Sequence, residues 1–149
     1  MFKIEEYRKE YDERILTFLE KAFTETGKEF NRNGKHSFYS DIKTNFEKFW
    51  CLFDEEELIG TVGVKPLNEN SCELKSLYVY KKYHGQKLGY RLMTIAIEYA
   101  KKVKYHAMLL DTISTKSERA IHLYERMGFE RIERYNQNEL ADVFMKLNL

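Results

Sequence analysis

One stretch of the chain combines a glycine-bearing turn with cationic side chains, a pattern that could bind phosphate. A predicted strand over Cys72–Val79 is followed by the turn His84–Gly89 (HGQKLG) and by an apolar-periodic segment that predicts a helix. A helix start presents unpaired backbone N–H groups and the positive end of the helix dipole, which together favour anions. Lys87 and Arg91 add positive charge. The residues alone fit both a phosphate-binding turn and an ordinary strand–turn–helix connection.

Two well-known nucleotide motifs agree less well with this turn. A P-loop requires G-x-x-x-x-G-K-[ST], and no Lys-Ser or Lys-Thr follows Gly89. A dinucleotide fingerprint requires three closely spaced glycines and an acid about 20 residues later. Asp111 does end the next apolar run, but only Gly85 and Gly89 are available here. A dinucleotide-binding oxidoreductase therefore stays a less favoured alternative.

A second stretch places polar groups along one side of a predicted helix. In Ser117–Phe129 (SERAIHLYERMGF), Ser117, Ala120 and Tyr124 are spaced i, i+3, i+7, so they share one face. Seven residues of helix cover about 10.5 Å, enough to place a hydroxyl and a phenol along an extended ligand. On its own, this stripe is more typical of a core face.

Together the two stretches resemble the two signatures of the GNAT acetyltransferase superfamily, [QR]-x-x-G-x-[GA] and N-x-x-A-x-x-L-Y-x-x-x-G-F. In the first, His84 takes the Gln/Arg position, Lys87 the first glycine and Gly89 the second. In the second, Ser117 replaces Asn. The chain is most similar to a branch of small bacterial acetyl-CoA-dependent N-acetyltransferases, closely over 49–149 and only in element order before that.

The resemblance implies one GNAT domain over 1–149. Its fold is α/β (α+β), with a single mixed, mostly antiparallel central sheet of about six to seven strands and helices on both faces. The sequence pattern agrees with that order of elements. Strands are expected at 2–7, 49–53, 58–65, 72–79, 107–111, 129–134 and 141–147, and helices at 12–26, about 38–46, 88–103 and 117–127. Gly60 and Gly63 predict a bulge or a close backbone approach in the third strand.

The resemblance also implies an acetyl-CoA site and a direct acetyl transfer to an amine. Tyr124 is expected to protonate the departing thiolate, the Leu77 N–H to bind the oxyanion, and Glu73 to act as general base. The expected contacts to the co-substrate come from Leu77, Tyr78, Val79, His84, Gly85, Gln86, Lys87, Leu88, Gly89, Ser117, Ala120 and Tyr124.

No motif in the sequence identifies the acceptor of the acetyl group. Loops carry specificity without disturbing a core, and the two polar, aromatic loops left for this role are 23–39 and 135–139. Phe30, Tyr39, Tyr135 and Asn138 are accordingly predicted to bind the substrate, a small polar amine. A protein or peptide N-acetyltransferase and a non-catalytic CoA-binding module stay open as alternatives.

The composition of the chain limits the kinds of partner, location and metal site that can be expected. The chain has 149 residues, 43% hydrophobic, with 25 basic and 24 acidic side chains, and such a balance gives no electrostatic argument for nucleic acid or an anionic membrane. No apolar run predicts a membrane span, and the first residues do not resemble a signal peptide. The two cysteines and four histidines lack metal-site spacing. We expect a cytoplasmic monomer or homodimer without a metal.

Overall fold

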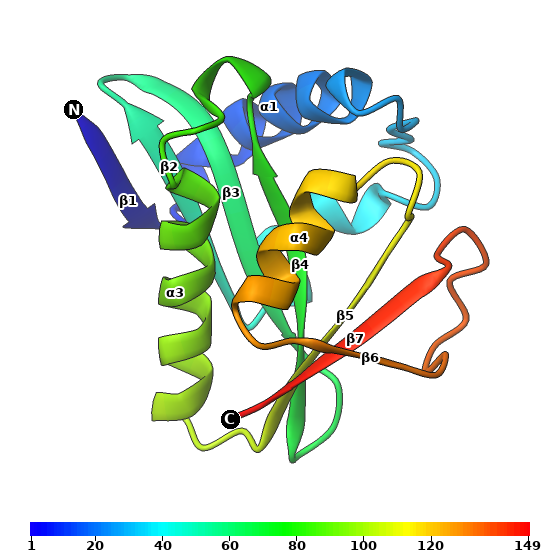
Figure 1. Ribbon diagram of the computed structural model, residues 1–149. Coiled ribbons are helices and arrows are strands. Elements are labelled where there is room, and N and C mark those ends of the chain that lie inside the picture. The colour runs from blue at the N-terminus through cyan, green and yellow to red at the C-terminus, as the bar shows by residue number, and fades with distance from the viewer.

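The apolar strands of the sequence assemble into one mixed seven-stranded sheet in the computed structural model, which describes residues 1–149 (Figure 1). The spatial order is β1-β2-β3-β4-β5-β7-β6. The strands are β1 (Phe2–Glu6), β2 (Lys48–Asp54), β3 (Glu57–Pro66), β4 (Ser71–Val79), β5 (Ala107–Thr112), β6 (Glu130–Ile132) and β7 (Val143–Asn148). Six or seven strands in a mostly antiparallel sheet were expected, and this is confirmed.

Only β4 and β5 pair in parallel, and α3 connects them. The other neighbouring strands are antiparallel, and the last strand, β7, lies between β5 and β6. A parallel pair needs a crossover rather than a hairpin, which explains why the long segment after β4 is a helix.

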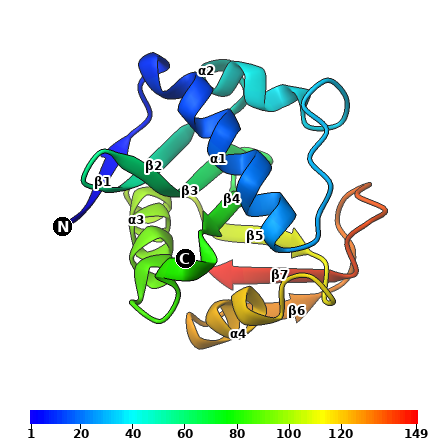
Figure 2. The ribbon, with the colours of Figure 1, turned by 90° about the horizontal axis from the view of Figure 1, so that it is seen from above.

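Helices cover both faces of the sheet. Seen from above, α1 and α2 lie on one side and α3 and α4 on the other (Figure 2). The helices are α1 (Asp12–Glu25), α2 (Ile42–Asn45), α3 (Leu88–Lys102) and α4 (Glu118–Arg126), with short 3₁₀ turns at Lys9–Tyr11, Ser37–Asp41 and Lys81–Tyr83. None of them is both long and apolar enough to cross a bilayer.

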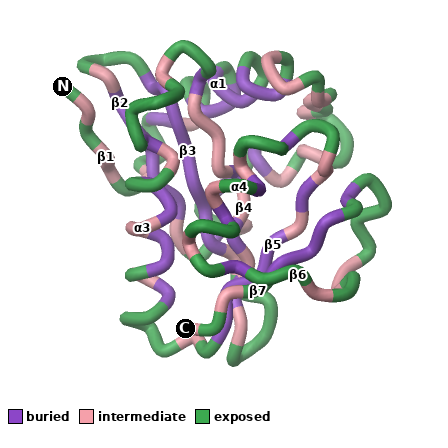
Figure 3. The backbone as a smooth tube through the Cα atoms, in the orientation of Figure 1, coloured by how far each residue is buried: buried purple, intermediate pink, exposed green.

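The core follows from the alternation of the strands and the stripes of the helices. β3 is buried along most of its length, and each turn of α3 carries both buried and more exposed residues (Figure 3). Ile15 and Leu19 of α1 and Leu92 and Ala96 of α3 are each 0% exposed, so both helices press their apolar stripes onto the sheet.

The predicted irregularity at Gly60 and Gly63 is present, but the extra residue belongs to β4. Thr61 pairs with Tyr78 and Gly63 with Lys75, so Val62 alone faces two residues of β4. One of those two, Ser76, has a φ of 63°, a left-handed conformation that is unusual outside glycine. Phe46 packs so closely that a side chain at Gly63 would clash with its ring.

Two local predictions differ from the structure. The expected helix over 38–46 is divided into a 3₁₀ turn and the short α2, because Asp41 leaves the helical conformation and its side chain accepts from the Thr44 N–H (3.2 Å). The strand expected over 129–134 is only three residues long, since β6 is an edge strand paired on one side.

Candidate active site

A large cleft opens where β4 and β5 diverge. The two strands pair only over Ser71–Glu73 and Ala107–Leu109, and Figure 1 shows them separating beyond that point. The cleft has a volume of about 2140 Å³ and is lined by β4, β5, α4, the turn before α3 and the loop after α1. Since small-molecule pockets usually measure about 300–1,000 Å³, this space is large enough for an extended ligand and a second, smaller one.

One edge of β4 is available to a ligand inside this cleft. From Leu74 to Val79 the strand pairs with β3 on one side and has no partner in β5 on the other. Backbone groups without a strand partner must bond to water or to a ligand. The bulge at Ser76 lies in this segment, held by a hydrogen bond from Thr61 Oγ1 to the Ser76 carbonyl (2.7 Å).

The start of α3 faces the same cleft. Lys87 is the residue before the helix, with a φ of 61° and no capping side chain, so the first N–H groups of α3 stay free. His84, Gly85, Lys87 and Gly89 line the cleft, and a ring nitrogen of His84 bonds to the Val79 carbonyl (3.0 Å). Free N–H groups at a helix start favour anions, and the binding of a phosphate by this turn stays a prediction.

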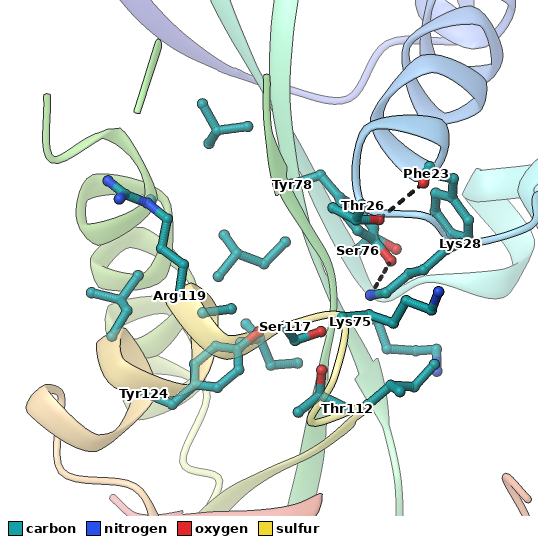
Figure 4. A pocket seen from close by; sticks show the side chains of 18 of the residues that line it. Phe23, Thr26, Lys28, Lys75, Ser76, Tyr78, Thr112, Ser117, Arg119 and Tyr124 are labelled. Carbon is teal, nitrogen blue, oxygen red and sulfur yellow. Dashed lines mark hydrogen bonds between the residues drawn. The ribbon is translucent and has the colours of Figure 1, made fainter. Parts of the chain in front are cut away.

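The polar stripe of α4 also faces the cleft. Ser117, Ala120 and Tyr124 all line it, and the Ser117 hydroxyl is not used to cap the helix. Burial and the negative charge of Asp111 raise the pKa of Tyr124, so its phenol stays protonated at neutral pH. Tyr124 and Ser117 lie on one side of the pocket, opposite Lys28 and Lys75 (Figure 4).

Two carboxylates lie side by side on β4 and β5. Glu73 accepts hydrogen bonds from Tyr135 Oη (2.5 Å) and Asn136 Nδ2 (3.4 Å), and Lys75 Nζ lies 3.6 Å from it. Asp111 accepts hydrogen bonds from the side-chain amide of Asn136 and from Asn138 Nδ2 (3.4 Å). The link between β6 and β7 therefore holds both carboxylates in place.

The loop after α1 brings a lysine into the cleft. Lys28 Nζ lies 5.1 Å from the centre of the Tyr78 ring and 3.4 Å from its hydroxyl. Burial lowers the pKa of Lys28 from its ordinary value, opposed by the charge of Asp111 and reinforced by that of Lys116. The same loop leads to Tyr39, whose hydroxyl shares a hydrogen bond with Ser76 Oγ and whose pKa burial raises to about 12.

Most residues predicted from the sequence meet in this cleft. Those that line it are Glu73, Leu77, Tyr78, Val79, His84, Gly85, Lys87, Leu88, Gly89, Ser117, Ala120, Tyr124, Tyr39 and Asn138. Their roles stay predictions.

Three predicted residues do not line the cleft. Gln86 is exposed on the outside of its turn. Phe30 packs between Phe23 and the stacked ring of His36, behind the cleft wall. Tyr135 packs on Phe144 and directs its hydroxyl to Glu73. We correct their placement accordingly: Phe30 and Tyr135 support the wall rather than form it.

Three cleft residues were missed as site residues. Lys28 and Lys116 lie in loops without any motif, and Asp111 attracted notice only as a possible ribose ligand in a dinucleotide site. The one available signal was position, because Asp111 ends the parallel partner of β4, where ligands of such sheets bind.

Comparison with known proteins agrees with this geometry. The model of the acetyltransferase (GNAT) family matches residues 10–129. The chain belongs to the GNAT acetyltransferase family. An uncharacterised N-acetyltransferase of Schizosaccharomyces pombe is 38% identical over 93 residues, covering 61% of this chain and 56% of that protein. The chain spans about half the length of the first curated relatives that it matches.

Solved GNAT structures share the fold along the whole chain. A GNAT-family acetyltransferase from Staphylococcus aureus superposes with a TM-score of 0.92 at 24% identity and 99% coverage of both chains. The PaiA N-acetyltransferase of Thermoplasma acidophilum, solved in complex with coenzyme A, gives a TM-score of 0.73 at 17% identity, covering 100% of this chain and 99% of that one. These similarities establish the GNAT fold.

Proposed function

We propose that the protein transfers the acetyl group of acetyl-CoA to a primary amine of a small molecule by direct attack in a ternary complex. The observation that carries the proposal is the divergence of β4 and β5 beside the free N-terminus of α3. An unpaired strand edge and an anion site are thereby joined in one cleft.

The residues present fit acetyl-CoA. The pyrophosphate would bind the free N–H groups at the start of α3, with Lys87 and His84 beside them. The pantetheine amides would bond to the unpaired edge of β4, much as an added strand would. The T. acidophilum enzyme, which has the same fold, was solved with coenzyme A.

Acetyl transfer requires an oxyanion donor and an acid for the leaving group. The amine nitrogen attacks the thioester carbon, the C–S bond breaks, and the amide forms. The Leu77 N–H, just after the β4 bulge, would stabilise the oxyanion, a contribution of about 2.7–4 kcal/mol in comparable sites. The protonated phenol of Tyr124 would donate its proton to the thiolate.

The ammonium proton of the acceptor would pass to one of the two carboxylates. Glu73 was the sequence-based choice, but it already forms an ion pair with Lys75 (3.6 Å). Asp111 forms no ion pair and lines the cleft, and its negative charge raises the pKa of both Tyr124 and Tyr78. We therefore favour Asp111 as the acceptor of the proton.

A small molecule fits the acceptor end better than a peptide does. Segments from three parts of the chain line this end: the loop after α1, the segment at His36–Tyr39, and the link Asn136–Asn138. Aromatic and amide groups that converge from several segments suit a small polar ligand.

Release of free thiol from acetyl-CoA in the presence of an amine panel tests the proposal. We expect amine-dependent thiol release and an acetylated product, both strongly reduced in Asp111→Asn and less reduced in Glu73→Gln. Acetyl-CoA binding without thiol release from any amine would instead support a non-catalytic CoA-binding module.

A further inference from the structure

Two unmatched charges of opposite sign lie at the acceptor end of the cleft. Lys28 takes part in none of the ion pairs of the chain, and its one hydrogen bond is the 3.4 Å contact to the Tyr78 hydroxyl. Asp111 accepts from two amides and likewise forms no ion pair. Both line the same cleft, and no ion pair joins them.

The surrounding charges single out this pair. Lys75 already lies beside Glu73, so that carboxylate has its counter-charge. Lys116, in contrast, adds a second positive charge near Lys28. A partly buried ammonium beside another cation, with no anion in contact, is unfavourable until an anion binds. The surroundings of Lys28 therefore favour the binding of an anionic group of a ligand.

We propose that the acetyl acceptor is an amino acid or a similar amino carboxylate, whose carboxylate binds Lys28 and whose amine lies at Asp111. This inference rests on the proposed function, since it names the acceptor of the same site. Asp111 and Tyr124 line the same cleft, so an amine at Asp111 shares it with the thioester expected beside Tyr124.

The same charges argue against two other classes of acceptor. A simple monoamine leaves Lys28 without a counter-ion, so it forgoes one charge-assisted contact. A polyamine would bring a second ammonium toward Lys28 and Lys116, where like charges repel it. The arrangement therefore discriminates by charge, and the side chain of the amino acid is left to the aromatic wall of Phe38 and Tyr39.

Matched pairs of acceptors test the proposal. Thiol release from acetyl-CoA is measured with the standard amino acids, with their amides, and with the amines obtained by decarboxylation, for example phenylalanine, phenylalaninamide and phenethylamine. Loss of a charge-assisted contact lowers kcat/KM by about ten- to hundredfold, and we expect this preference for the free acid.

Variants of Lys28 then assign the preference to one side chain. We expect Lys28→Gln to remove most of the ratio between acid and amine, and Lys28→Glu to reverse it in favour of the decarboxylated amines. Lys21→Gln removes a lysine from the exposed side of α1 and should keep the wild-type ratio. Stabilisation of each variant by acetyl-CoA in a melting experiment confirms that the co-substrate site is intact.

The outcomes separate this inference from the proposed function. Equal kcat/KM for amino acids and their decarboxylated amines, or an unchanged ratio in Lys28→Gln, would overturn the assignment of the acceptor and leave acetyl transfer intact. Absence of thiol release with every member of every pair would overturn both.

Discussion

Replacing Tyr124 by phenylalanine should lower the rate of acetyl transfer without changing the stability of the fold. No hydrogen bond within the chain involves its hydroxyl, which reaches the cleft beside Ser117 (Figure 4). Removing it therefore leaves no buried group unpaired, and we expect the melting temperature to change by less than about 2 °C. Acetyl-CoA affinity should also stay close to wild type, because the ring that lines the cleft is kept.

The rate should fall by about 100-fold, the lower end of what a positioned general acid contributes, or about 2.7 kcal/mol of activation free energy. The leaving group explains why the effect is not larger, since an alkyl thiol has a pKa near 8.5 and its thiolate leaves without help at alkaline pH. The raised pKa of Tyr124 keeps its phenol protonated over this range. The ratio of wild-type to mutant kcat should therefore be larger at about pH 7 than at about pH 9.5.

Thiol release at saturating substrates measures kcat, and calorimetry measures acetyl-CoA affinity. Tyr99→Phe is the matched control, because it removes a phenol of α3 that does not line the cleft and that bonds to Glu47 (2.7 Å). Wild-type kcat in Tyr124→Phe at about pH 7 would refute its role as the acid and leave it as a core residue.

Three further predictions concern the turn before α3, the bulge in β4 and His36 in the segment after α1. Gly89→Glu should abolish acetyl-CoA binding in a protein that still folds, because its carboxylate repels a phosphate at the start of α3. Gly89→Ala should retain binding, since the added methyl group meets only the Leu123 side chain at 3.3 Å. Equal acetyl-CoA affinities of the two variants would show that the α3 N-terminus binds no phosphate. Thr61→Val removes the buried hydrogen bond that holds the Ser76 carbonyl. We therefore expect it to lower the free energy of unfolding by about 1–3 kcal/mol in urea titrations and to weaken acetyl-CoA binding. Thr24→Val, at an exposed threonine that also bonds to a backbone carbonyl, is the control. Burial lowers the pKa of His36, so as the pH falls the imidazole is protonated first in the unfolded state. The free energy of unfolding should therefore decrease as the pH falls from about 7.5 through 6.5. An equally steep decrease in His36→Asn would contradict this prediction.

The order of the elements could be predicted because each carries its own local signal. The alternation in β4, the apolar run of β5 and the stripe of α3 are all visible within ten to fifteen residues. The turn before α3 was equally legible, because glycines and cations cluster within it. Periodicity could not supply the divergence of β4 from β5, because the pairing between two strands is not a local signal.

The acceptor end could not be predicted in the same way, because it depends on contacts between distant residues. Tyr135 was expected to face the substrate, yet it bonds to Glu73, which is 62 residues away in the chain. Lys28 reaches Tyr78 across 50 residues from a loop without a motif. The left-handed conformation of Ser76 also escaped prediction, since nothing in its residue type requires it.

Calorimetric titration of acetyl-CoA into the protein tests the central claim most directly, that the cleft between β4 and β5 is an acetyl-CoA site. We expect saturable binding of one molecule per chain and an increase in melting temperature that grows with ligand concentration, because only the folded state binds it. NAD⁺ in the same titration should give no saturable heat. Absence of acetyl-CoA binding up to millimolar concentration, or equal binding of NAD⁺, would contradict the account.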